Sequence, residues 1–167
     1  PESVLRANIL AQITFALNRI YTEFYRSRGY DFDITSSTAG DQSYVEGRDV
    51  FENIKELAGE LYGTYIRRKG SVEPLFAAYC DGRRTSCDGL SQWGTVGLAE
   101  DGQNAMDILR YYYGDDIELV TDAPIGTMTE TVPRAPLRIG SIGDDVRVAQ
   151  IRLNRIAKNY PSIPRIA

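Results

Sequence analysis

Four consecutive residues, Ser91-Gln92-Trp93-Gly94, place the only tryptophan of the chain beside an amide side chain and a glycine. An indole ring offers a flat apolar face, an amide offers a donor and an acceptor, and a glycine lets another chain approach closely. These groups together suit the binding of a sugar or an acylated sugar. The alternative is structural, with Trp93 as a buried anchor and Gln92 as a helix cap.

The chain contains no histidine, so any acid–base chemistry has to come from Asp, Glu, Tyr or Lys. Ser-His and Cys-His catalysis and histidine-ligated metal sites are excluded for the same reason. Asp33, Asp41 and Asp88 are candidates for contact with sugar hydroxyls, and the alternative for each is that it caps a turn. We expect the ligand contacts to come from neutral hydrogen-bonding and stacking groups, which suit N-acetyl sugars: Gln42, Tyr44, Gln92, Trp93 and Gly94.

Two cysteines, Cys80 and Cys87, enclose the polar hexapeptide DGRRTS. A disulfide between them would close a short loop and stabilise the fold by about 2–3 kcal/mol. Such a bond indicates an oxidising, exported setting, whereas a reduced cytosolic pair is the alternative. Two thiols without imidazole do not favour a metal site, so we expect no cofactor.

Length and charge set further limits. The 167 residues are enough for one core-forming domain and an appendage. The net charge of −4 argues against a nucleic-acid partner, which would require a basic face. No apolar run reaches the roughly 18 residues needed to span a membrane. Because the chain starts at Pro1 without Met or a signal peptide, we expect the natural N-terminus to lie upstream.

Hydrophobic periodicity predicts an α+β fold of amphipathic helices packed on a small antiparallel sheet, followed by a C-terminal helical segment. Helices are expected over residues 1–28, 49–62, 90–100 and 104–113. Strands are expected over residues 64–68 and 72–79, as a hairpin across Lys69-Gly70, and over residues 117–120. The helix after Asp49 should point these apolar residues inward: Val50, Phe51, Ile54, Leu57, Leu61 and Tyr62.

Three segments in the first 120 residues resemble the stage II sporulation protein D and amidase-enhancer family. Residues 4–16, VLRANILAQITFA, are similar to the family's opening helix, ALKAQAVAARTYA. Residues 91–99, SQWGTVGLA, are close to its SQWGAxGMA, and residues 108–114, ILRYYYG, resemble its ILxxYYPG. The order and spacing of the three agree, which makes the set more specific than any one of them.

A second resemblance follows a linker at residues 121–136 that contains three prolines. Residues 137–156, LRIGSIGDDVRVAQIRLNRI, look like the start of a small peptidoglycan-binding module with the pattern LRxGSxGxxVxxLQxxLN. We therefore expect a domain at residues 1–120, the linker, and a partial helical module at residues 137–167 whose remainder would lie beyond Ala167.

The first resemblance implies chemistry on peptidoglycan. Sporulation members of that family are lytic transglycosylases, in which one carboxylic acid protonates the glycosidic oxygen and the sugar's 6-hydroxyl closes an anhydro ring. The family's catalytic Glu precedes the opening helix, so its counterpart should lie upstream of Pro1, and the catalytic residue of this chain is unknown. Glu2 fits the solvated first turn of a helix better.

Departures from the family pattern affect the metal and the catalysis. The segment over residues 33–44, which resembles the family's zinc-binding loop, has neither Cys nor His, so no zinc is expected. Ile13 stands where the family has Arg, and Ser86-Cys87-Asp88-Gly89 replaces His-Gly-Val-Gly.

The resemblances imply a peptidoglycan-binding cell-wall protein, extracellular in the wall or spore envelope and related to lytic transglycosylases. The alternative is a non-catalytic wall-binding scaffold or amidase enhancer. Expected partners are glycan strands and, in that alternative, a cell-wall amidase.

Overall fold

The structure of the protein is a computed structural model that describes residues 1–43, 45, 47, 49–121, 123, 136–143, 146, 149–150, 153–154, 157 and 164. The chain divides into two compact units, Pro1–Ile125 and Gly126–Ala167. Most of the predicted linker lies outside the described residues, so the domain boundaries stay a prediction. In the second unit, the described residues 146, 149, 150, 153, 154 and 157 are helical.

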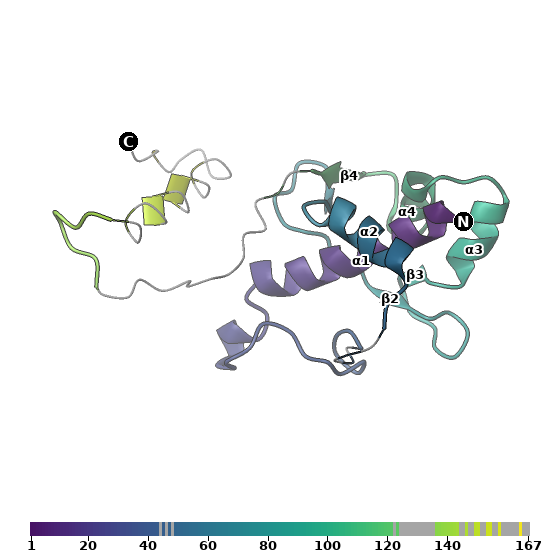
Figure 1. Cartoon of the computed structure of the whole chain (residues 1–167), viewed down its shortest axis with the longest axis horizontal. Coiled ribbons are helices and arrows are strands. Elements are labelled where there is room, and N and C mark those ends of the chain that lie inside the picture. The colour runs from purple at the N-terminus through teal and green to yellow at the C-terminus, as the bar shows by residue number, and fades with distance from the viewer. Residues whose placement is uncertain are drawn as a thin grey trace. The chain divides into compact units, whose positions relative to one another are not determined.

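Helix α1 (Glu2–Tyr21) packs against α2, α3, α4 and β1 of the first unit (Figure 1). Its buried face consists mainly of small and aliphatic residues, so neighbouring elements approach it closely: Ala7, Leu10, Ala11, Thr14 and Phe15. The α-helix ends earlier than predicted, because the Thr22 hydroxyl donates to the Asn18 carbonyl at 2.7 Å and Glu23 has a left-handed φ of 50°. A 3₁₀ turn, η1 (Arg26–Arg28), follows and ends at Gly29.

The central sheet pairs β1 (Tyr65–Arg68) antiparallel with β4 (Ile117–Val120). Ile66 and Ile117 are fully buried in it, and the Ile66 amide donates to the Thr14 hydroxyl of α1 at 2.9 Å. The predicted hairpin with residues 72–79 is formed only in part, since Arg67 and Pro74 form an isolated antiparallel bridge and the Leu75 amide donates to the Ile66 carbonyl at 2.8 Å. The pairing does not extend into a ladder, because Pro74 has no amide to donate, and Tyr79 belongs instead to the next strand.

Helix α2 (Glu52–Leu61) begins after the predicted Asp49 cap and lies against α1. Only Leu61 of this helix is buried, and the Phe51 side chain is 78% exposed. Val50 and Tyr62 are exposed as well, so the predicted inward face was too wide. The periodicity of apolar residues located helix α2. Only part of the apolar stripe of α2 packs against other elements of the first unit, and the rest is exposed.

The remaining elements lie between residues 79 and 113. The strands β2 (Tyr79–Cys80) and β3 (Leu90–Ser91) pair in parallel, and α3 (Gly94–Glu100) follows directly. Leu90–Ser91 is thus a strand where a helix was predicted. Helix α4 (Ala105–Tyr113) starts at a capping box formed by Asn104 and Asp107 and ends at Gly114, close to the prediction.

The predicted α+β fold is confirmed, with helices packed on a small antiparallel sheet. Its core consists of aliphatic and aromatic side chains, most of them from α1, the antiparallel sheet and α4: Ala7, Leu10, Ala11, Leu61, Ile66, Ala77, Leu90, Ile108, Leu109, Tyr113 and Ile117. Within the described part of the chain, no helix has the length and apolar character needed to cross a membrane.

Candidate functional site

The parallel β2–β3 pair brings the cysteine loop and the Ser91-Gln92-Trp93-Gly94 segment together. The Gln92 amide donates to the Cys80 carbonyl at 2.9 Å, and the Trp93 amide donates to the Asp81 carbonyl at 3.1 Å. The ladder therefore continues past both strands into the loop. Residues that are close in sequence are held in a fixed register at the surface.

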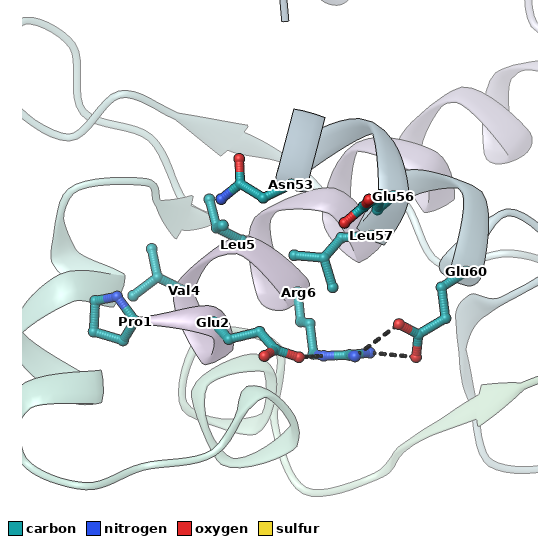
Figure 2. A pocket seen from close by; sticks show the side chains of 9 residues that line it. All are labelled: Pro1, Glu2, Val4, Leu5, Arg6, Asn53, Glu56, Leu57 and Glu60. Atoms are coloured by element: carbon teal, nitrogen blue, oxygen red, sulfur yellow. Dashed lines mark hydrogen bonds and ion pairs between the residues drawn. The ribbon is translucent and has the colours of Figure 1, made fainter. Parts of the chain in front are cut away.

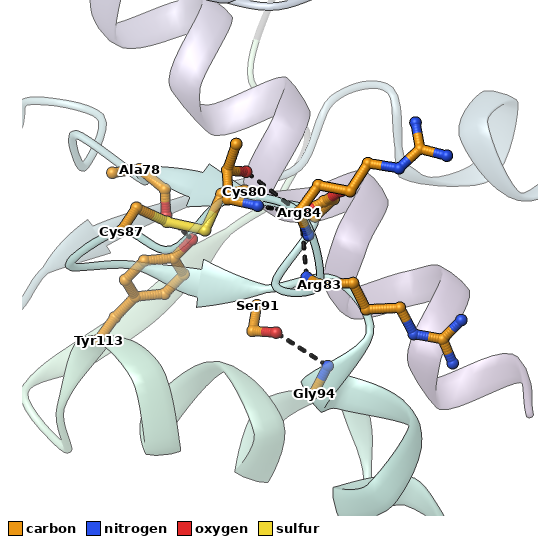
Figure 3. Close-up of a disulfide and its surroundings, with 10 residues drawn as sticks. Ala78, Cys80, Arg83, Arg84, Cys87, Ser91, Gly94 and Tyr113 are labelled. Carbon is orange, nitrogen blue, oxygen red and sulfur yellow. Dashed lines mark hydrogen bonds between the residues drawn. A yellow bond between two sulfur atoms is a disulfide. The ribbon is translucent and has the colours of Figure 1, made fainter.

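The predicted disulfide between Cys80 and Cys87 is confirmed, with Cα atoms 6.1 Å apart (Figure 3). Inside the loop, Oδ1 of Asp81 accepts backbone hydrogen bonds from Thr85, Arg83 and Arg84 at 2.9, 3.0 and 2.9 Å. These hydrogen bonds stabilise the carboxylate and lower the pKa of Asp81 to about 2. The covalent bond and the Asp81 turn together fix the loop backbone.

Two glycines allow this loop and α4 to approach the segment closely. A Cβ on Gly82, whose φ is +79°, would lie 1.8 Å from the Ser91 hydroxyl. A Cβ on Gly94 would lie 2.3 Å from the Tyr112 hydroxyl. The Ser91 hydroxyl in turn accepts the Gly94 amide at 3.0 Å, as Figure 3 shows. The backbone at Gly82 and Gly94 is therefore packed so closely against Ser91 and Tyr112 that a side chain does not fit at either position.

Trp93 is 50% exposed, so it is not a buried core anchor. The guanidinium carbon of Arg83 lies 3.5 Å from the centre of its ring, in a cation–π arrangement. Trp93 occupies the position before α3 without a side-chain cap bond. The structure thus holds a flat apolar ring at the surface, with a cation from the disulfide loop over one of its faces.

The Gln92 segment is tied to the first half of α1. The backbone carbonyl of Gln92 accepts a hydrogen bond from the Thr95 hydroxyl at 2.6 Å. Nδ2 of Asn8, on α1, donates to the same hydroxyl at 3.0 Å. Figure 1 accordingly places the start of α1 beside α3. Oδ1 of Asn8 is buried without a hydrogen-bond partner among the described residues. The side of α1 that faces the site therefore retains an unused acceptor.

Gln42 belongs to a loop that contacts the middle of α1, where its Nε2 donates to the Gln12 carbonyl at 2.8 Å. A hollow of about 540 Å³ lies beside Gln12. Among the described residues, its lining does not include Gln92, Trp93 or Gly94 and consists of Gln12, Ser43, Val45, Gly47, Asp49, Val50, Phe51 and Ile54. Tyr44 lies outside the described residues. Gln42 thus anchors its loop, and nothing described brings it to Trp93; its contact with ligand stays a prediction.

Asp41 is structural rather than a ligand group. Its side chain is fully buried, and its Oδ1 lies 2.8 Å from Nε of Arg19. Its Oδ2 accepts hydrogen bonds from the Tyr25 hydroxyl and from the backbone amide and hydroxyl of Thr35. Burial alone would raise the pKa of Asp41, but the hydrogen bonds from Tyr25, Thr35 and Arg19 lower it. The guanidinium of Arg19 also lies 3.7 Å from the Phe24 ring. Asp33, a second loop candidate, pairs with Arg26.

A second hollow, which sequence reasoning missed, lies at the start of α1 and beside α2 (Figure 2). It has a volume of about 620 Å³ and a lining rich in carboxylates: Pro1, Glu2, Val4, Leu5, Arg6, Asn53, Glu56, Leu57 and Glu60. Arg6 bonds Glu2 at 2.6 Å and both oxygens of Glu60 at 2.8 and 2.9 Å. Arg6 therefore lowers the pKa of Glu60 and holds that carboxyl ionised.

Among the described residues, no group of three or more His, Cys, Asp or Glu is placed to hold a metal ion. Comparisons with protein-family models, curated proteins and solved structures find no match to this chain. The family resemblance therefore stays a prediction that depends on the three motifs.

Proposed function

We propose that the first unit binds the glycan strands of peptidoglycan on the surface around Trp93. The observation that carries this proposal is the half-exposed indole, held rigidly by the β2–β3 ladder and the disulfide loop. A sugar ring presents C–H groups on its faces, which suit contact with a flat aromatic ring. The adjoining neutral hydrogen-bonding groups of this segment complement N-acetyl substituents.

Three further features support a role in the cell wall. The segment around Trp93 is one of the three ordered motifs that resemble the sporulation protein D and amidase-enhancer family. Residues 137–156 resemble a peptidoglycan-binding module, which would act on the same polymer. The disulfide favours an oxidising compartment, so we place the protein outside the cytoplasm, in the wall or spore envelope.

Cleavage of the glycan strand by a lytic transglycosylase mechanism is the stronger claim, and it requires a protonated carboxylic acid. In the resembling family that acid precedes the helix that corresponds to α1. The hollow at the start of α1 lies near that position, but the acids Glu2 and Glu60 both bond to Arg6. Arg6 lowers the pKa of Glu60, so that carboxyl is a poor proton donor, and the non-catalytic scaffold or amidase enhancer is the second candidate.

Co-sedimentation with purified insoluble peptidoglycan tests the binding function. The wild-type chain should pellet with peptidoglycan, and Trp93→Ala should bind about 1–3 kcal/mol more weakly. Tyr30→Ala is the matched control, because Tyr30 is 53% exposed and lies beyond the far end of α1. Equal pelleting of Trp93→Ala and wild type, or no pelleting of the wild type, would contradict the proposal.

Digestion of the same peptidoglycan separates the two candidates. Release of fragments with anhydro-muramic ends would assign the transglycosylase reaction to the protein. Binding without such ends, combined with faster digestion by an added cell-wall amidase, would assign the scaffold or enhancer role.

A further inference from the structure

Two adjacent arginines, Arg83 and Arg84, lie at the exposed tip of the disulfide loop. Figure 3 shows their side chains extending from the loop away from the disulfide. Their backbone amides are fixed by the Asp81 carboxylate, so the positions from which both side chains start are well defined. The loop is therefore a rigid support for two cations.

These two guanidinium groups differ from most others in the first unit. Five arginines there form ion pairs with carboxylates: Arg6, Arg19, Arg26, Arg67 and Arg68. Neither Arg83 nor Arg84 forms an ion pair with any residue that the structure describes. The loop also carries Asp81, and Asp88 follows it, but the Asp81 carboxylate accepts backbone amides rather than the guanidinium groups. Without an ion pair among the described residues, the two guanidinium groups remain available to an anion from outside the chain.

The stacking of Arg83 on Trp93 determines how this positive charge is presented. The guanidinium carbon lies over the indole, 3.5 Å from the ring centre. The N–H groups of the guanidinium lie in its own plane and remain able to donate two parallel hydrogen bonds to a carboxylate. A ligand that covers the rest of the indole can therefore present an acidic substituent to Arg83 at the same time.

We propose that Arg83, with Arg84 beside it, binds a carboxylate carried by the saccharide that lies against Trp93. The site then takes an acidic sugar in preference to a neutral one. This inference rests on the proposed glycan binding and adds the charge of the ligand to it. In peptidoglycan the carboxylate has two sources, which are the lactyl group of peptide-free muramic acid and the stem peptide.

Calorimetric titration of the full chain with three soluble probes distinguishes these cases. The probes are a neutral chitooligosaccharide, peptide-free peptidoglycan strands and peptide-bearing strands of similar length. Wild type should bind one or both acidic probes at least about tenfold more tightly than the neutral probe, as expected for a charged bidentate contact. A preference for peptide-free strands identifies the lactyl carboxylate, and a preference for peptide-bearing strands identifies the stem peptide.

The variant Arg83→Gln keeps hydrogen-bonding capacity but removes the charge. It should lose the preference for acidic probes, so that its affinities for the acidic and neutral probes become similar. Arg28→Gln is the matched control, because Arg28 is also stacked on an aromatic ring, 3.9 Å from the centre of Phe24, and lies beyond the end of α1. This control should retain the wild-type preference. Near-ultraviolet circular dichroism of each variant verifies that the surroundings of the tryptophan are folded.

Two results separate failure of the inference from failure of the proposed function. If wild type binds neutral and acidic probes equally, or if Arg83→Gln keeps the preference, the carboxylate contact is refuted and glycan binding stands. If wild type binds none of the three probes, the proposed glycan binding itself is refuted.

Discussion

Gly82→Ala provides the sharpest test of how the disulfide loop is built. The φ of Gly82 is +79°, a region that costs an L-residue roughly 1 kcal/mol or more. The added Cβ would also lie 1.8 Å from the Ser91 hydroxyl and 2.8 Å from the Ser91 Cβ. Since atoms cannot approach so closely, the loop has to move away from the segment that carries Trp93.

Gly70→Ala separates these two costs. Gly70 has nearly the same φ, +80°, but no described atom lies within 4 Å of the Cβ that alanine would add, so that variant measures backbone strain alone. Overpacking adds about 1–3 kcal/mol to such strain. We therefore expect Gly70→Ala to lower the free energy of unfolding by about 1 kcal/mol and Gly82→Ala by about 2–4 kcal/mol.

Urea denaturation of the oxidised protein measures both values, with circular dichroism as the signal. Gly82→Ala should also weaken binding to peptidoglycan, because the loop supports Arg83 beside Trp93. Equal destabilisation of the two variants would refute the close contact between the loop and Ser91.

Two further predictions concern charged groups. Asp41→Ala should lower the free energy of unfolding by about 3–5 kcal/mol in urea denaturation, because it leaves Arg19 buried without its carboxylate, and a loss below about 1 kcal/mol would contradict a buried ion pair. In the folded state the pKa of Asp81 is about 2 and that of Asp41 is lowered, whereas an unfolded Asp titrates near about 3.9. Their stabilising contribution is therefore complete above about pH 4 and is lost as the pH falls toward about 2, and Asp81→Asn should reduce this pH dependence of the free energy of unfolding.

Elements with strong local signals were predictable from the sequence. Asn104 and Gly114 mark the two ends of α4, and the described strand over Ile117–Val120 matches its predicted range. The pairing of β1 with β4 was not predictable, because Tyr65 pairs with Val120 across a long stretch of chain. Local patterns carry information about element type but little about which distant strands meet.

The candidate site was predictable to the extent that its parts are neighbours in sequence. Cys80, Cys87 and Trp93 lie within one short stretch, and the spacing of the two cysteines allows the disulfide. The contact between Arg83 and Trp93 could not be predicted, because it depends on the parallel pairing of β2 with β3. Strands of two residues are too short to produce an alternating pattern in the sequence. The buried Arg19–Asp41 pair was missed for a related reason, since nothing in the sequence marks a charged residue of α1 as buried.

The central claim is that a sugar ring covers the indole of Trp93, and fluorescence tests it most directly because the chain has a single tryptophan. Titration with soluble peptidoglycan strands should change the emission of Trp93 in a saturable manner, with the same Kd as co-sedimentation. Binding that leaves the tryptophan emission unchanged would contradict the claim.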